Sequence, residues 1–309
     1  MSSSSSVSAP IIDKCAACGK VEDGFTKLKK CSACLSVKYC SRECQASHRP
    51  QHKKECKKRA AELYDEKLFK EVEPDPEACP ICMAAMPFED NACCFKPCCG
   101  KMICTGCIYA MTVNQMKRGK RQYEDNICPF CRTPPCKSVK EEIRLLKKLL
   151  DTGNGGAYKQ LADYYHRGVS GLSQDYQKSN ELLLKAGELG CAQAYHNLGN
   201  SYYFGHGFEV DKMMAIYYYE LAAMGGSITA RYNLGSMERM AGNETRAIKH
   251  FILAARAGFE MSLDNVKIGF KEGLVTKDEY ASTLRAYHDR QKEMKSDARD
   301  KASGFFRRG

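Results

Sequence analysis

The chain has 309 residues, enough for two or three domains, and its 19 cysteines lie almost entirely within residues 1–136. We find no apolar run long enough to span a membrane, and residues 1–7 lack the basic and apolar regions of a secretory signal. No phosphate loop, dinucleotide fingerprint or hydrolase triad is recognisable, which argues against the corresponding enzyme classes. We therefore expect a cytoplasmic or nuclear protein, whose regularly spaced cysteines bind metal rather than form disulfides.

Residues 1–12 are a Ser-rich head that we expect to be disordered. After this head come eight potential metal ligands in four pairs: Cys15 and Cys18, Cys31 and Cys34, Cys40 and Cys44, and His52 and Cys56. The spacing within the last two pairs places both ligands on one face of a helical turn. Eight such ligands suffice for two closed tetrahedral zinc sites.

The order of these pairs, with Tyr39 beside Cys40 and the run Ser41–Gln45, resembles the MYND-type zinc finger over residues 13–58. The resemblance implies that the pairs interleave, so that one ion is held by Cys15, Cys18, Cys40 and Cys44, and the other by Cys31, Cys34, His52 and Cys56. We expect His48, one helical turn before His52, to be a surface or packing residue because the ligand set is already full.

Residues 59–77 predict a helical linker, which Pro74 and Pro76 end. The basic run from Lys53 to Arg59 could be a nucleic-acid patch or a nuclear address, but we favour a solvated helix face. The formal net charge is +11 with neutral thiols. Zinc binding by thiolates would lower that charge to about +4, which removes most of the argument for nucleic acid.

Residues 78–136 contain a second cysteine-rich segment with three C-x2-C pairs and one adjacent pair: Cys79 and Cys82, Cys98 and Cys99, Cys104 and Cys107, and Cys128 and Cys131. A thiolate pair on a tight turn presents both sulfurs to one ion, and two pairs complete a closed structural site. Because few apolar residues separate the pairs, we expect the metal to supply much of the folding free energy.

The order of these pairs resembles a RING-type zinc finger, although Lys101 stands where that family usually has a His ligand. The resemblance implies that the first and third pairs share one zinc, namely Cys79, Cys82, Cys104 and Cys107, and that Cys128 and Cys131 lie on the second. We expect Cys98 and Cys99 to complete the second site, with Cys94 or Cys93 as the alternative. Together the two fingers would hold about four structural zinc ions.

The remainder of the chain predicts helices. Ser138 and Glu141 form a capping box that opens a linker helix over residues 138–152. An internal repeat follows over residues 153–275, in which Ala157-x3-Leu161, Ala194-x3-Leu198 and Ala230-x3-Leu234 recur at intervals of 37 and 36 residues. A period of this length with two helices per unit predicts a solenoid of helix-turn-helix repeats, and the motif resembles the Sel-one-like repeat.

The end of the chain predicts a capping helix over residues 276–303, opened by Thr276 and Glu279, and then a tail over residues 304–309. The predicted fold is therefore multidomain: two small zinc-stabilised cross-brace fingers followed by an all-α solenoid. We expect the solenoid to offer a concave surface to a peptide or helix, with some of Tyr202, Tyr203, Tyr217, Tyr218 and Tyr219 on it and the others packed between helices.

The RING resemblance implies a ubiquitin ligase that positions a charged ubiquitin-conjugating enzyme and has no covalent intermediate of its own. It implies that Ile81 and Pro129 form the apolar contact with that enzyme and that Arg132 bridges enzyme and ubiquitin. The substrate would be held by the MYND-type finger or by the repeats. The alternative is a non-enzymatic adaptor, and the hypothesis we favour least is a nuclear regulator that contacts nucleic acid. We expect Cys136 and Cys191, which lie outside the finger patterns, to be loop and packing residues.

Overall fold

The computed structural model describes residues 13–23, 25–74, 78–87, 92–118, 127–169 and 171–306. The predicted Ser-rich head, residues 75–77 of the predicted linker and residues 307–309 of the predicted tail lie outside this description. The chain divides into two compact units, Met1–Lys70 and Glu71–Gly309, and each is described by itself.

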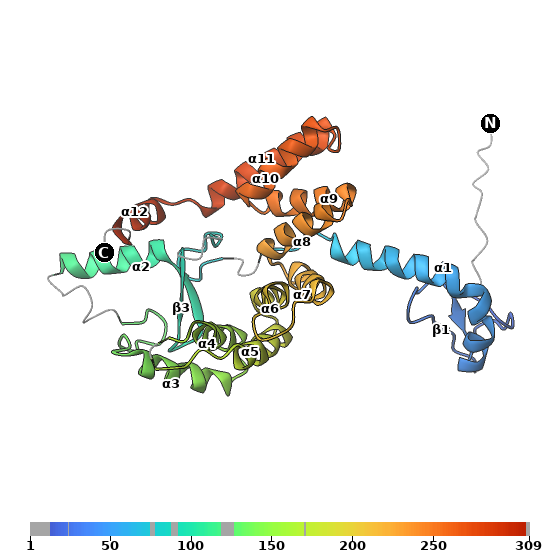
Figure 1. Ribbon diagram of the computed structural model, residues 1–309, viewed down its shortest axis with the longest axis horizontal. Helices are drawn as coiled ribbons and strands as arrows, with labels where there is room; N and C mark the ends of the chain where they lie inside the picture. The colour runs from blue at the N-terminus through green and yellow to red at the C-terminus, as the bar shows by residue number, and fades with distance from the viewer. Residues whose placement is uncertain are drawn as a thin grey trace, which may run out of the picture. The chain divides into compact units, whose positions relative to one another are not determined.

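The first unit has little regular structure before its helix. Strands β1 (Lys29–Lys30) and β2 (Lys38–Tyr39) pair antiparallel, and helix α1 (Arg42–Leu68) follows (Figure 1). Ser41 begins the helix because its hydroxyl accepts a hydrogen bond from the Cys44 amide. Four of the six residues in the buried cluster of this unit are cysteines, so ligand side chains occupy the place of an apolar core.

The predicted linker differs from the structure. A separate helical linker was expected over residues 59–77, whereas α1 runs from within the first finger to Leu68 without interruption. The segment Glu71–Pro74 is not helical. Proline disfavours the helical conformation in the residue before it, which agrees with the absence of helix before Pro74.

The second unit begins with the central finger. Strands β3 (Cys93–Lys96) and β4 (Lys101–Cys104) form an antiparallel hairpin in which Cys93 lies opposite Cys104, and helix α2 (Thr105–Lys117) follows directly. The hairpin also joins the finger to the helical repeats. The ring of Phe95 packs against the cluster of Leu146, Ala157 and Leu161.

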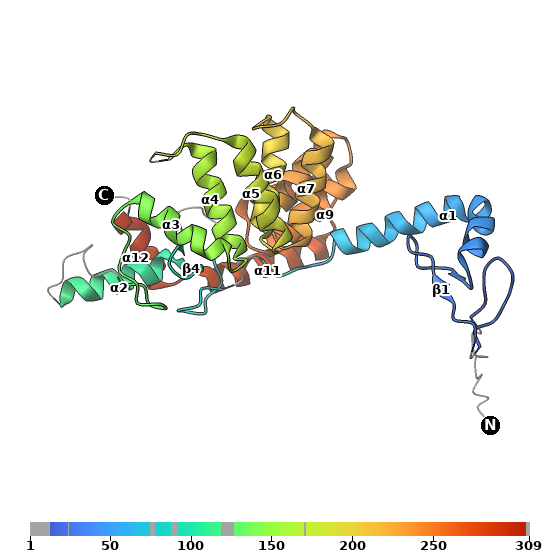
Figure 2. The same cartoon turned by 90° about the horizontal axis from the view of Figure 1, so that it is seen from below.

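Helices fill the remainder of the second unit, and neighbours in sequence pack on one another (Figures 1 and 2). Their bounds are α3 (Val139–Leu150), α4 (Gly155–Arg167), α5 (Tyr176–Glu188), α6 (Ala192–Phe204), α7 (Lys212–Met224), α8 (Ile228–Met240), α9 (Glu244–Arg256), α10 (Glu260–Lys271), α11 (Lys277–Met294) and α12 (Asp297–Phe306). The predicted fold class, zinc-type fingers followed by a helical solenoid, is confirmed.

Glycine lets paired helices approach closely within this solenoid. A Cβ atom on Gly199 would lie 2.6 Å from the ring of Tyr219, and one on Gly235 would lie 2.7 Å from the ring of Phe251. Both aromatic rings are buried, at 2% and 1% exposure. The two glycines occupy equivalent places in successive repeats, so the close packing of an aromatic ring on a glycine recurs from one repeat to the next.

Two helix starts were expected to be capping boxes. Thr276 and Glu279 form the complete reciprocal pair at the start of α11. At α3 the prediction is half wrong, because Ser138 accepts from the Glu141 amide but the Glu141 carboxylate accepts from the Lys137 amide instead.

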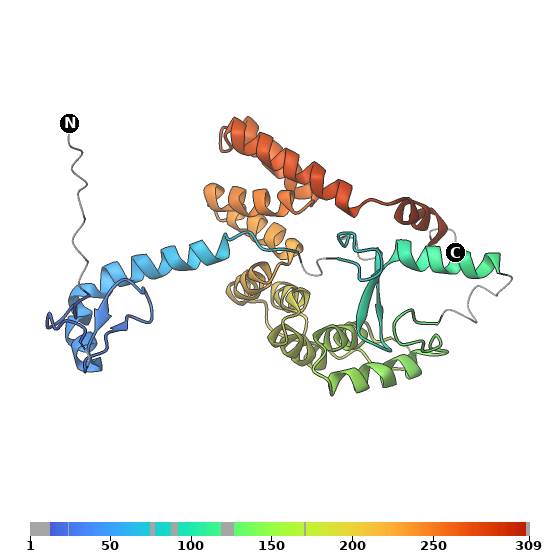
Figure 3. The same ribbon diagram turned by 180° about the vertical axis from the view of Figure 1, so that it is seen from behind.

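The prediction of one capping helix over residues 276–303 is wrong. Helix α11 ends at Met294, Lys295 is extended, and α12 begins at Asp297 and lies along α2 (Figure 3). Ser296 starts the new helix because its hydroxyl accepts from the Arg299 amide at 3.3 Å. The tail prediction is corrected as well, since residues 304–306 belong to α12 and the Phe305 ring meets Tyr109 edge-on with centroids 5.2 Å apart.

Candidate metal centres

The structure brings the sixteen ligands expected from the sequence into four groups of four. In each group the ligand atoms lie within 4.8 Å of one another. The groups are Cys15, Cys18, Cys40 and Cys44; Cys31, Cys34, His52 and Cys56; Cys79, Cys82, Cys104 and Cys107; and Cys98, Cys99, Cys128 and Cys131. In both fingers the first ligand pair lies with the third and the second with the fourth, which is the cross-brace order.

The spacing of the sulfur atoms fits zinc. A tetrahedral ion with Zn–S bonds of about 2.3 Å holds its sulfurs about 3.8 Å apart. The distance is 3.6 Å for Cys18 and Cys40, 3.8 Å for Cys31 and Cys56, 3.8 Å for Cys79 and Cys107, and 3.6 Å for Cys99 and Cys128. These separations are far longer than a disulfide bond. Three groups offer four thiols each and the remaining group offers three thiols and an imidazole, and both donor sets are those of closed structural zinc sites.

The thiols within one group differ in how readily they ionise. In the group of Cys79, burial opposes ionisation but backbone N–H donors from Cys104, Cys82 and Ile81 outweigh it and lower the pKa of Cys79 to about 6. Burial first, and then neighbouring thiols, raise the pKa of Cys107. Four thiolates packed together therefore need a divalent cation to neutralise them, and zinc supplies that charge when bound.

Four C-x2-C pairs share one backbone geometry. In each, the residue after the second cysteine donates its N–H to the carbonyl of the first: Gly19 to Cys15, Leu35 to Cys31, Met83 to Cys79 and Arg132 to Cys128, at 2.8 to 3.0 Å. All four donors adopt the left-handed conformation, with φ of 74°, 57°, 58° and 58°. The three that are not glycine are the only such residues in the described part of the chain, so this tight turn stores strain at three of the four pairs.

Side chains outside the ligand set also contact the sulfurs. In the first finger, Arg49 Nη1 donates to the Cys56 sulfur at 3.6 Å and Gln45 Nε2 to the Cys31 sulfur at 3.9 Å. His48 lies outside the groups, stacks on His52 and hydrogen-bonds the Tyr39 hydroxyl at 3.0 Å. Such outer contacts orient ligands and offset thiolate charge. His48 and Arg49 lie one helical turn before His52, and this spacing is the signal by which the sequence could have revealed them.

The second group of the central finger uses a hairpin turn. Cys98 and Cys99 lie between β3 and β4, where Gly100 has φ of 70° and donates its N–H to the Lys96 carbonyl at 2.8 Å. The turn carries both sulfurs to Cys128 and Cys131. The alternatives Cys93 and Cys94 lie in β3, outside the group, and contact the carbonyls of Pro87 and Phe95.

The three residues expected to contact a conjugating enzyme lie at the surface of the zinc loops. Ile81 is 40% exposed between two ligands of one group, and Pro129 and Arg132 are exposed within and after the last ligand pair. Sequence reasoning missed two further apolar side chains in the same loops, Met83 at 74% and Phe130 at 39% exposure. Each lies within two residues of Ile81 or Pro129 in a C-x2-C turn, and this position could have identified them from the sequence.

Arg299 on α12 is a contact to the central finger that the sequence analysis missed. Its guanidinium donates to the carbonyls of Ala85 at 2.6 Å and Ala84 at 3.3 Å, and reaches the Cys82 sulfur at 3.7 Å. It passes Gly106, where a Cβ atom would lie 2.6 Å from the Arg299 side chain. Helix α12 is thereby fixed to the first zinc loop and to α2.

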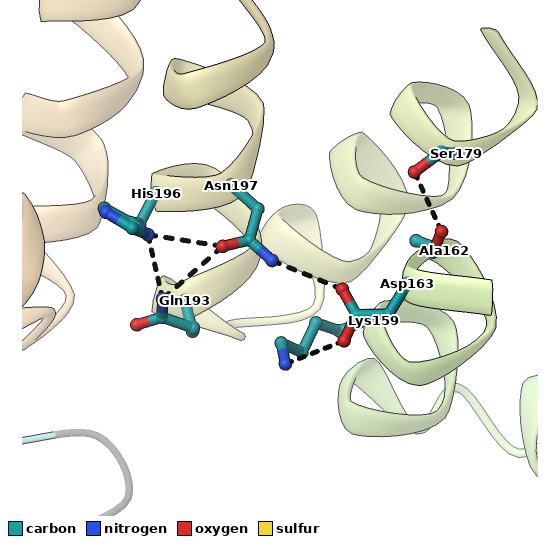
Figure 4. A network of polar contacts seen from close by, with 7 residues as sticks. All are labelled: Lys159, Ala162, Asp163, Ser179, Gln193, His196 and Asn197. Carbon is teal, nitrogen blue, oxygen red and sulfur yellow. Dashed lines mark hydrogen bonds and ion pairs between the residues drawn. The ribbon is translucent and has the colours of Figure 1, made fainter. Parts of the chain in front are cut away.

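Polar side chains connect the first helices of successive repeats (Figure 4). Asn197 on α6 donates to Asp163 on α4 at 3.4 Å, and Asp163 pairs with Lys159 at 3.0 Å. Asn233 on α8 contacts His196 on α6 at 3.2 Å. Of the five tyrosines proposed for a binding face, Tyr219 is buried and bonds Asn200, and Tyr202 stacks between Phe208 and Tyr218. Tyr217, by contrast, is 49% exposed.

The two cysteines outside the fingers do not resemble nucleophiles. Burial raises the pKa of the Cys136 thiol, which opposes formation of a thiolate. Cys191 precedes α6 and packs against the buried cluster that contains Ala186 and Leu198.

Comparison with known proteins identifies two of the three parts. The MYND finger family matches residues 15–56, and the Sel1 repeat family matches residues 156–191, 192–227 and 228–259. The chain therefore carries a MYND finger and Sel1 repeats, as the sequence predicts. The family matches leave the central finger unassigned, and its ligand groups alone suggest a RING-type fold.

Comparison with solved structures gives matches to part of the chain. A Sel1 repeat protein from Oxalobacter formigenes is 20% identical, with a TM-score of 0.44 over 60% of this chain and 71% of that one. A protective antigen of uropathogenic Escherichia coli with an SLR fold is 22% identical, with a TM-score of 0.42 over 63% of this chain and 39% of that one. MamA is 23% identical, with a TM-score of 0.31 over 50% of this chain and 89% of that one.

The parts together define a zinc-binding protein of the protein-interaction class. The MYND finger binds zinc, the other two cysteine groups are compatible with structural zinc, and a MYND finger and Sel1 repeats indicate protein–protein contacts. Among the described residues, no helix combines the length and apolar character needed to cross a membrane.

Proposed function

We propose that the central finger is a RING-type ubiquitin ligase module, which brings a charged ubiquitin-conjugating enzyme to a protein held by the MYND finger or the repeats. The observation that carries the proposal is the pair of interleaved four-ligand groups with exposed apolar side chains on both zinc loops. An apolar contact on two loops of fixed separation is what a partner enzyme needs for docking in one orientation.

Catalysis by such a module is positioning. Holding the thioester and the acceptor amine together converts a bimolecular reaction into an effectively unimolecular one, with no covalent intermediate on the ligase. The raised pKa of Cys136 and the packed position of Cys191 agree with a mechanism that uses no thiol of this chain. We also propose a reducing compartment, cytoplasm or nucleus, because the cysteines of both fingers lie in groups arranged as metal ligands, an arrangement typical of reducing compartments.

Arg132 is the proposed bridge between conjugating enzyme and ubiquitin. Its side chain is exposed, so it is available to a partner. The same left-handed backbone conformation occurs at Gly19, Leu35 and Met83, so it is a property of the C-x2-C turn and not of Arg132 in particular. The proposal for Arg132 therefore depends on its charge and its place after the last ligand.

A second candidate, a non-enzymatic adaptor, is favoured by α12. This helix packs on α2 and on the chain after Cys82, so part of the finger surface is already used within the chain. An adaptor would need the zinc to hold its binding surfaces and would need no conjugating enzyme.

Discharge of ubiquitin from a panel of charged conjugating enzymes, measured with the full chain, distinguishes the two functions. We expect Ile81→Ala and Arg132→Ala to slow discharge at least about tenfold, because each removes a contact made to the bound enzyme. Matched controls are Ile268→Ala on α10, where the side chain is 45% exposed, and Arg285→Ala, an exposed position on α11. If no enzyme in the panel is discharged, or if the two finger variants behave as the controls do, the ligase function is refuted and the adaptor stands.

A further inference from the structure

The segment Glu71–Pro74 lies in a groove on the solenoid. Together with residues of α8, α9 and α11 it lines a half-open pocket of about 240 Å3. Apolar side chains, including Ile228 and Leu253, form part of the wall. The segment presents an alternating sequence to this wall, with Val72 between Glu71 and Glu73.

Three arginines from three helices line the groove: Arg231 of α8, Arg256 of α9 and Arg290 of α11. Arg231 is only 4% exposed, and while burial lowers its pKa to about 10, the charge of Glu71 acts in the opposite direction. Arg256 lies 3.9 Å from the Glu71 carboxylate. Buried cations of this kind require anionic partners.

Arg290 is incompletely satisfied. Its Nη1 pairs with Glu293 at 3.0 Å, but its buried Nε and Nη2 have no hydrogen-bond partner among the described residues. The other acidic side chain of the wall, Asp289, pairs with Lys292 at 3.2 Å. The groove thus keeps donor capacity for a further carboxylate, which its own acidic residues do not fill.

The resident segment is held weakly. The Glu71 side chain is 67% exposed, and its distance to Arg256 is near the upper limit for an ion pair. An exposed pair of this length contributes little. A segment tethered to the solenoid nevertheless competes at an effective concentration on the order of millimolar, since it cannot diffuse away.

We propose that this groove is a docking site for an acidic peptide of a partner protein, in which carboxylates flank an apolar residue, and that Glu71–Pro74 occupies it until such a peptide displaces them. The site uses none of Ile81, Pro129 and Arg132, so the inference does not depend on ligase activity. The resident segment shows part of the chemistry that the groove accepts, a carboxylate beside Arg256.

The test uses a fluorescein-labelled peptide with the sequence of residues 70–77, added to the full chain and followed by fluorescence anisotropy. The double variant Glu71→Gln/Glu73→Gln weakens the tethered competitor, so we expect it to bind the peptide about two- to fivefold more tightly than the natural chain. Within that double variant, Arg290→Gln is expected to weaken binding at least about tenfold, because it removes donors that the described residues leave unused. Arg256→Gln, whose ion pair with a carboxylate is exposed, should weaken binding by about two- to fivefold. Higher salt should weaken binding as well, because the contacts are ionic.

Two controls make the outcome decisive. Arg285→Gln removes an exposed cation of α11 outside the groove and should leave binding unchanged. A peptide with every carboxylate replaced by its amide should not bind. The proposal is overturned if the double variant fails to bind the acidic peptide, if the amide peptide binds equally well, or if Arg256→Gln and Arg290→Gln bind as Arg285→Gln does while their helical circular dichroism is unchanged.

Discussion

The zinc fingers and the helical repeats are stabilised in opposite ways. In the first finger the buried cluster consists of four cysteines with Leu28 and Tyr39. In the last repeats the buried apolar cluster contains no metal ligand and includes Ile248, Phe251, Leu263 and Val266. One part therefore depends on metal–ligand bonds, whereas the other depends on contacts between neighbouring helices.

Removal of zinc is expected to have the largest effect and to separate the two parts. Metal binding contributes about 10–16 kcal/mol to the folding of zinc-finger peptides. A strong chelator should therefore remove about four ions and expose residues 13–58 and 78–131 to hydrogen exchange, while α6–α9 stay protected. Native mass spectrometry counts the ions, and exchange mass spectrometry locates the change. Continued protection of both fingers after loss of all zinc would contradict the comparison.

Truncation of Phe251 should destabilise the solenoid and leave the zinc fingers folded. The side chain is 1% exposed and its ring fills the space left open at Gly235. Phe251→Ala is expected to destabilise the solenoid by about 3–5 kcal/mol, because it leaves a cavity. Urea unfolding monitored by helical circular dichroism measures the loss, and Phe204→Ala, where the ring is 62% exposed, is the control. The zinc content of the fingers should stay unchanged.

Arg299 tests whether the two kinds of structure are independent. Arg299→Ala removes the donors to the Ala84 and Ala85 carbonyls, with an expected cost of up to about 3 kcal/mol at that contact. Hydrogen exchange should rise in α12 and in residues 82–86 while zinc remains bound. Arg285→Ala on α11 serves as the control. If hydrogen exchange in the finger does not change, α12 covers the finger without stabilising it.

The pH dependence of stability should differ between the parts. His250 is fully buried in the solenoid, and burial, followed by the charges of Arg231 and Arg246, lowers its pKa from 6.5 to about 3. Between these values the unfolded chain binds the proton and the folded chain does not, so stability falls as pH decreases below 6.5. At pH 5 the loss is roughly 2 kcal/mol. Urea titrations at pH 7 and pH 5 measure it, and His250→Gln should abolish this part of the difference.

The sequence predicts the two parts unequally well. Ligand spacing and the repeat of Ala and Leu define the fingers and the solenoid because each pattern is local and tied to one kind of structure. The break at Lys295 was missed because a Ser-Asp helix start within a polar helical pattern carries little signal. The contact of Arg299 with the Ala85 carbonyl and that of Glu71 with Arg256 join residues far apart in the sequence. No local sequence pattern indicates which distant surface a charged side chain will contact.

The smallest expected effect concerns the knuckle turn itself, at Gly19. This residue has φ of 74°, and a Cβ atom there would have no neighbour within 4 Å. Gly19→Ala therefore adds left-handed strain without a clash and should weaken zinc retention by about 1 kcal/mol. Chelator competition on the full chain measures the change. Met83→Gly, at a side chain that is 74% exposed, should act in the opposite direction on the central finger, because it relieves the same strain and loses little burial. If the natural chain, Gly19→Ala and Met83→Gly all retain zinc equally, left-handed strain in the turn does not affect zinc affinity.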